Sequence, residues 1–130
     1  MLFSLFFWAV SGYGHIRRQP MLKGYAQSVG FPSPYLAGWP SGVWLVAASA
    51  SIVVGIYPDI GALMIGAFVI PAALYFHRFW TVEDAMQKQT HVMLFFRNVI
   101  ILGASLAMFA SFVALGDDLR FTVTGPVFRF

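Results

Sequence analysis

Arg97 and Asn98 are adjacent polar residues inside an apolar stretch that runs roughly from Val92 to Leu115. An arginine near the middle of a lipid bilayer costs about 2.5–3.5 kcal/mol even on the lowest measured scale, so it needs a compensating role. Neighbouring helix positions point about 100° apart, and the two side chains therefore face different surroundings. We expect Asn98 in the interior of a helix bundle, within hydrogen-bond reach of the first or third helix.

Further polar residues share a helix face with Asn98. They follow one another at steps of three, four, seven and seven residues, which return to one side of an α-helix: Asp84, Gln87, His91, Asn98 and Ser105. A second stripe, about 100° away, holds Glu83, Thr90 and Arg97. We interpret Glu83, Asp84 and Gln87 as a structural polar cluster near the start of this helix.

Three roles are open for Arg97. Its side chain can extend to the lipid headgroups, it can pair with a carboxylate, or it can contact a bound ligand. Glu83 and Asp84 are the carboxylates nearest in sequence. They lie more than three helical turns away, so an ion pair with Arg97 would need another subunit.

A quinone site suits the chemistry of these residues, because it needs an apolar slot and one or two hydrogen-bond donors. Aromatic walls are available in Phe79, Trp80, Phe95 and Phe96. The candidate quinone-binding residues are His77, Trp80, His91, Arg97 and Asn98. The alternative is structural: Asn98 then holds the bundle together, and its replacement by leucine weakens the bundle by about 0.6–2 kcal/mol. We favour the structural role.

Metal and thiol chemistry fit the sequence less well. The three histidines, His15, His77 and His91, all end apolar helices, but no two of them have the spacing of a paired ligand, and we predict no metal site. The sequence contains no cysteine, which excludes a disulfide, a thiolate nucleophile and iron–sulfur ligation. We predict no catalytic residues, and an accessory rather than an enzymatic role for the chain on its own.

The composition predicts an integral membrane protein. Hydrophobic residues make up 59% of the 130 residues and charged residues 10%, whereas a soluble domain carries about 25% charged residues. The predicted fold is all-α, a four-helix membrane bundle with helices at about 1–16, 41–57, 59–77 and 82–115. The basic residues form no run, so nucleic-acid binding is not expected despite the net charge of +3.

Local signals refine these boundaries. Thr81 and Asp84 resemble a capping box, so the fourth helix should start near Val82 and run unbroken past Arg97. Pro71 should kink the third helix or open a gap in its hydrogen bonding. The loops after the first and third helices hold five basic residues and the opposite side holds Arg120 and Arg129. The positive-inside rule then places both loops in the cytoplasm and both termini outside.

The chain resembles the DoxX family, whose members are small four-helix membrane proteins. The resemblance rests on Tyr75-Phe76-His77-Arg78-Phe79-Trp80 and on Phe95-Phe96-Arg97-Asn98, with Gly30-Phe31-Pro32-Ser33-Pro34 and Gly55-Ile56-Tyr57-Pro58 before them. It covers roughly residues 10–112. It implies a four-helix bundle in a bacterial-type inner membrane, with a loose link to thiosulfate:quinone oxidoreductase and terminal oxidase assemblies.

Three functions remain open at this point. The leading one is a non-catalytic or quinone-adjacent membrane subunit of a redox complex, with the lipid bilayer and other membrane subunits as partners. In it, residues 1–116 form the membrane domain and the tail 117–130 docks on a partner. The alternatives are a stand-alone quinone-linked oxidoreductase and a small-solute transporter. The transporter is disfavoured because the sequence shows no inverted repeat and few polar groups within its apolar stretches.

Overall fold

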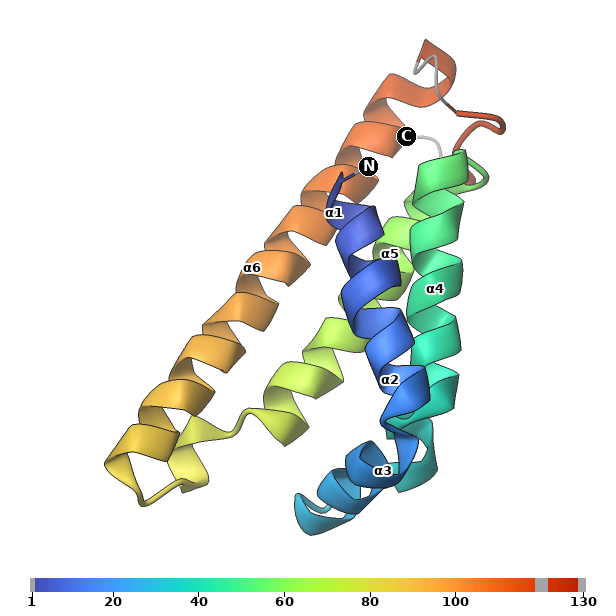
Figure 1. Cartoon of the computed structure of the whole chain (residues 1–130). Coiled ribbons are helices and arrows are strands. Elements are labelled where there is room, and N and C mark those ends of the chain that lie inside the picture. The colour runs from blue at the N-terminus through green and yellow to red at the C-terminus, as the bar shows by residue number, and fades with distance from the viewer. Residues whose placement is uncertain (1, 119–121, 129–130) are drawn as a thin grey trace.

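The computed structural model describes residues 2–118 and 122–128, and these ranges contain helices and no strand (Figure 1). The first helix is continuous through three segments: α1 (Leu2–Phe6), the π-helix η1 (Phe7–Gly12) and α2 (Tyr13–Arg17). The remaining elements are α3 (Gln19–Ser28), η2 (Pro34–Ala37), α4 (Trp39–Val54), α5 (Pro58–Pro71), the π-helix η3 (Ala72–Phe76), η4 (Phe79–Thr81), α6 (Ala85–Leu115) and η5 (Gly116–Asp118). The predicted all-α four-helix fold is confirmed.

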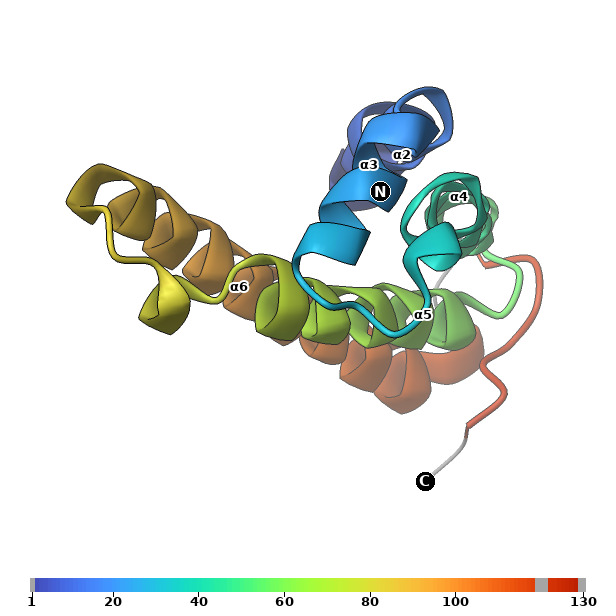
Figure 2. The same ribbon diagram turned by 90° about the horizontal axis from the view of Figure 1, so that it is seen from below.

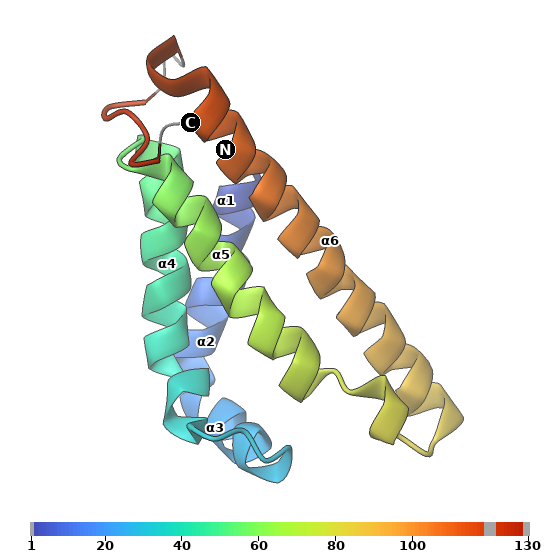
Figure 3. The same cartoon turned by 180° about the vertical axis from the view of Figure 1, so that it is seen from behind.

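Helix α5 lies between α4 and α6, and the first helix packs on α4 (Figures 1 and 3). The helices are close together at the end that carries the α4–α5 hairpin and spread apart at the end that carries α3 (Figures 1 and 3). We call these the hairpin end and the open end. Seen from the open end, α3 lies across the end of the bundle (Figure 2). Elements at the open end and the connections between them carry five basic residues: Arg17 in α2, Lys23 in α3, Lys88 in the first turn of α6, and Arg18 and Arg78 between elements.

Two helical segments are long and apolar enough to cross a membrane, Pro58–Thr81 with 24 residues and Ala85–Leu115 with 31 residues. Trp39–Val54 is also apolar but shorter. The sidedness of the bundle stays a prediction, because Arg120 and Arg129, which define the less basic side, lie outside the described residues.

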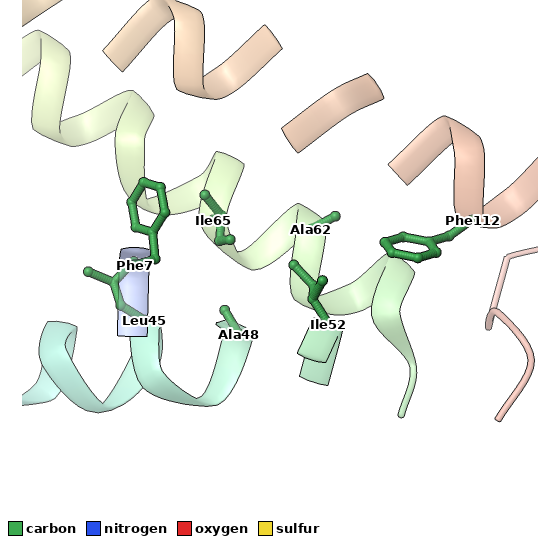
Figure 4. Packing of buried hydrophobic residues seen from close by; sticks show 7 residues of the cluster. All are labelled: Phe7, Leu45, Ala48, Ile52, Ala62, Ile65 and Phe112. Atoms are coloured by element: carbon green, nitrogen blue, oxygen red, sulfur yellow. The ribbon is translucent and has the colours of Figure 1, made fainter. Parts of the chain in front are cut away.

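The apolar core joins all four helices. It consists of seven buried residues, shown in Figure 4: Phe7, Leu45, Ala48, Ile52, Ala62, Ile65 and Phe112. Small residues bring the helix backbones together around it. A Cβ atom at Gly61 would lie 2.6 Å from the Ala48 carbonyl oxygen, and one at Gly42 would lie 2.7 Å from the Gly12 carbonyl oxygen. Such close approach is how helices pack in lipid, where dispersion replaces the hydrophobic effect as the driving force.

A tight hairpin joins α4 to α5. Gly55 ends α4 in the left-handed region at φ 75°, and its N–H and that of Ile56 both donate to the Ser51 carbonyl at 3.0 Å. This is a helix C-terminus of the Schellman type, which favours glycine. Tyr57 is left-handed as well, at φ 47°, and Pro58 then starts α5 at a position that needs no N–H donor.

The tail of the chain folds back on this hairpin. Asp59 is fully buried, and its Oδ2 atom accepts hydrogen bonds from the N–H groups of Val127 at 2.8 Å and Phe128 at 3.0 Å. The Gly55 carbonyl accepts two more, from Val123 and Thr124. The backbone N–H groups of the described part of the tail, 122–128, therefore donate to the α4–α5 hairpin of the same chain. Docking of the tail on a partner stays a prediction.

The predicted start of the fourth helix is wrong by three residues. Helix α6 begins at Ala85, and Asp84 itself is the N-cap, with Oδ1 accepting from the Gln87 N–H at 2.8 Å. Thr81 belongs to η4 instead, where its hydroxyl donates to the Arg78 carbonyl. An aspartate at the N-cap competes well with threonine, which is why the helix starts at the later signal. From there α6 runs unbroken past Arg97, as predicted.

Candidate functional site

A pocket of about 630 Å³ opens between the first helix, α3, α4, α5, η3 and α6. The helices spread apart towards the open end, so their backbones do not meet there. The side chains between them do not fill the gap completely, and the pocket remains. Its walls are mainly apolar, and their aromatic residues include Phe6, Phe31, Trp44, Phe68 and Phe76. The size and the apolar walls are those of a site for a small lipophilic molecule.

Three of the five predicted quinone-binding residues line this pocket: His77, Arg97 and Asn98. His77 ends the π-helix η3, whereas Arg97 and Asn98 come from the middle of α6. Asn98 is buried, as predicted, and Arg97 is exposed. The two adjacent residues of α6 thus reach the same pocket, Asn98 from the interior of the bundle and Arg97 from its surface.

The polar atoms of this group are not used up by the fold. The Asn98 Nδ2 and His77 Nδ1 atoms are buried and have no hydrogen-bond partner among the described residues. The interhelical hydrogen bond that we expected from Asn98 is therefore not made by its Nδ2 donor. A buried donor left unsatisfied costs about 1–3 kcal/mol, which a ligand in the pocket would recover in part.

The other two predicted residues, His91 and Trp80, do not line the pocket. His91 packs against His77 with ring centroids 5.9 Å apart, and its Nδ1 atom is also buried without a partner among the described residues. Trp80 is half exposed and meets the rings of Phe79 and Phe95 edge-on. The aromatic residues predicted as walls therefore pack on one another: Phe79, Trp80, Phe95 and Phe96. The aromatic residues that do line the pocket come from other parts of the bundle.

One member of the predicted structural polar cluster caps a helix. Glu83, Asp84 and Gln87 are all exposed, and the Asp84 side chain closes the first turn of α6 by accepting from the Gln87 backbone N–H. A structural role for the three residues together stays a prediction.

Sequence reasoning missed His15 as a pocket residue. Its Nδ1 atom lies 2.7 Å from the Ser11 carbonyl oxygen, and its ring meets Phe68 edge-on at 5.4 Å. A carbonyl can only accept, so neutral His15 carries its proton on Nδ1 and presents Nε2 as an acceptor. The sequence showed a histidine at the end of the first helix. It did not show that His15 and His77 would line the same pocket, because they come from helices far apart in the chain.

Both π-helical segments border the pocket. Val10 and Ser11 of η1 and Ala72 and Phe76 of η3 are in its wall. Pro71 precedes η3 and has no N–H for the Ala67 carbonyl, so the predicted disturbance of the third helix is confirmed as a change of helix type. Single turns of π-helix are frequent at functional sites.

Helix α3 and the loop that follows it close the pocket on the side of the open end of the bundle. The Tyr25 hydroxyl donates to the Phe76 carbonyl at 2.8 Å, and Phe31 packs against the rings of Tyr75 and Phe76. Arg78 donates to the Val29 carbonyl. Burial raises the pKa of Tyr25 above its usual value, with an opposing effect of the Arg78 charge, so the phenol stays protonated and remains a donor at neutral pH.

The described residues contain no group of three or more histidine, aspartate or glutamate side chains that could hold a metal ion. Comparison with protein-family models matches residues 1–78 to the family described as DoxX. No curated protein and no solved structure matches the chain.

Proposed function

The chain belongs to the DoxX family of membrane proteins, and on that premise we propose that it binds a quinone in this pocket as a membrane subunit of a redox complex. The observation that carries the proposal is the buried Asn98 Nδ2 donor, which has no partner among the described residues and stands in an aromatic pocket. The aromatic walls suit a flat ring, and an amide donor suits a carbonyl oxygen.

The residues present fit a quinone on several counts. Asn98 and Arg97 would donate to carbonyl oxygens, and Phe68 and Phe76 would hold the ring and its tail. His77 supplies one more unused ring nitrogen. A bound quinone would supply two-electron redox chemistry, while these side chains bind it, orient it and keep water away.

A subunit role follows from what the chain can supply. The sequence contains no cysteine, so electrons would reach a quinone from a bound cofactor or from another subunit. The lipid bilayer is the one partner that the family and the apolar helices support directly. The redox partner, the bacterial-type inner membrane and the cytoplasmic position of the open end belong to the proposal.

The test is equilibrium binding of a short-tailed ubiquinone analogue to the protein in lipid nanodiscs. Asn98→Leu should lower its affinity about tenfold, because one hydrogen bond worth about 1–1.5 kcal/mol is lost. Gln87→Leu is the matched control, since it makes the same change at an exposed position on the same helix face. Equal affinity in both variants would refute the quinone site.

The partner is tested separately by purification in mild detergent followed by mass spectrometry. A redox subunit should co-purify with haem or flavin proteins. Recovery of the chain alone with bound quinone would instead support the stand-alone oxidoreductase.

A further inference from the structure

The outer face of the first helix carries a second hollow, of about 490 Å³. Its lining residues follow one another at helical spacing: Val10, Tyr13, Gly14, Arg17 and Arg18. Positions i, i+3, i+4, i+7 and i+8 lie on one side of a helix. The floor is therefore apolar towards the start of the helix and strongly basic at its end.

Charge in this part of the chain is one-sided. The first acidic residue in the sequence is Asp59, whereas Arg17, Arg18 and Lys23 precede it. Arg17 and Arg18 are both exposed. The two guanidinium groups thus have no carboxylate in the first 58 residues to pair with, which leaves this basic end of the helix open to an anion from outside the segment.

Arg17 is held in place over the hollow. Its Nη1 atom donates to the Tyr13 hydroxyl at 3.3 Å, and its Cζ atom lies 5.7 Å from the centre of the Tyr13 ring. The ring carries the guanidinium on its face and leaves the remaining N–H donors free. Holding the group in advance lowers the entropy that binding would cost.

Gly14 keeps the hollow open between Tyr13 and the arginines. A Cβ atom at this position would meet no other atom within 4 Å. The glycine is therefore not required by the packing of the protein itself, and any side chain placed there would project into the space of the hollow.

We propose that this hollow binds an anionic phospholipid. The phosphate would lie against Arg17 and Arg18, which match its oxygen atoms with paired donors. One acyl chain would follow Tyr13 and Val10, which are both more than half exposed. The headgroup would then lie at the open end and the acyl chain would point towards the hairpin end, which is how a lipid is oriented in the leaflet on the side of the open end. Basic residues beside a membrane helix attract anionic lipid.

The test is native mass spectrometry of the full chain released from vesicles of phosphatidylglycerol and phosphatidylcholine, counting the lipid retained. Wild type should retain phosphatidylglycerol, and Arg17→Gln with Arg18→Gln should retain about 30-fold less, from about 1 kcal/mol per basic residue. Lys23→Gln is the control for general charge, because Lys23 is exposed on α3 and outside the hollow. It should change retention by about fivefold at most, the effect of one basic residue near the membrane surface.

Gly14→Leu separates a shaped site from simple charge attraction, because it fills the hollow and keeps both arginines. It should lower retention about tenfold, because the leucine side chain reduces the apolar area that the acyl chain buries against the helix. Unchanged retention in Gly14→Leu, or an equal loss in Lys23→Gln, would overturn the proposal. So would tighter binding of free inorganic phosphate than of vesicles. Asn98→Leu should retain lipid like the wild type, so failure of the quinone proposal would leave this one standing.

Discussion

The hairpin end and the open end of this bundle differ in how closely their helices pack and in what surrounds their buried polar groups. At the hairpin end, Gly61 lets two helix backbones touch, and Asp59 satisfies two backbone donors of the tail. Towards the open end, the Asn98 Nδ2 and His77 Nδ1 atoms are buried and have no partner among the described residues. Buried atoms without a partner among the described residues also occur elsewhere in the bundle, at Asp59 Oδ1, Ser4 Oγ and Ser49 Oγ. The difference is that Asn98 and His77 line a pocket that a ligand could fill, whereas Asp59, Ser4 and Ser49 do not.

The largest effect should come from Asp59→Leu. It leaves the N–H groups of Val127 and Phe128 without the carboxyl oxygen that accepts from both, and a donor that loses its partner costs about 1–3 kcal/mol. We expect a loss of about 3–5 kcal/mol in the free energy of unfolding, measured by denaturant titration in detergent micelles. Asp59→Asn keeps an acceptor oxygen and should lose less than half of that. Equal losses would show that the tail does not depend on this acceptor.

Gly61→Leu should be next. Its Cβ atom would lie 2.6 Å from the Ala48 carbonyl oxygen, so α4 and α5 must move apart. Overpacking of this kind costs about 1–3 kcal/mol. The matched control is Gly103→Leu on α6, where a Cβ atom would meet nothing within 4 Å. Thermal unfolding followed by circular dichroism should place only the first variant below the wild type.

Asn98→Leu should change stability in the opposite direction at the open end. Removing a buried amide whose Nδ2 has no partner among the described residues should raise the free energy of unfolding by about 1–2 kcal/mol. The same denaturant titration measures it, without added quinone. A loss of stability would instead restore the structural role that the sequence favoured for Asn98.

The smallest effect concerns the start of α6. Asp84→Ala removes the cap and should cost about 0.5–1 kcal/mol, whereas Thr81→Ala should be close to neutral because its exposed hydroxyl bonds the Arg78 carbonyl within η4 and not the first turn of α6. Hydrogen exchange of the first turn of α6 would report the difference. Faster exchange in Thr81→Ala than in Asp84→Ala would place the cap at the earlier residue.

Much of the fold could be predicted because it depends on local patterns. Apolar runs of membrane length and Pro71 each act on their own segment. The start of α6 was predicted three residues early, because Thr81 and Asp84 are both good N-caps and the sequence does not show which one is used. The candidate site could be predicted in part, since the face of α6 placed Asn98 in the interior. The aromatic wall depends on which helices spread apart, and that comes from contacts such as Gly12 with Gly42 that no single segment contains. His15 entered the pocket for the same reason.

The bond between Asp59 and the tail also sets an order of events during synthesis. The acceptor precedes its donor at Val127 by 68 residues. At a translation rate of about 5–20 residues per second, this delay is about 3–14 s. During that time the first three helices can enter the membrane while the hairpin still lacks its closing contacts. A chain whose synthesis stops before this point would therefore leave the Asp59 carboxyl group in the hairpin without the two backbone donors that it has in the finished protein.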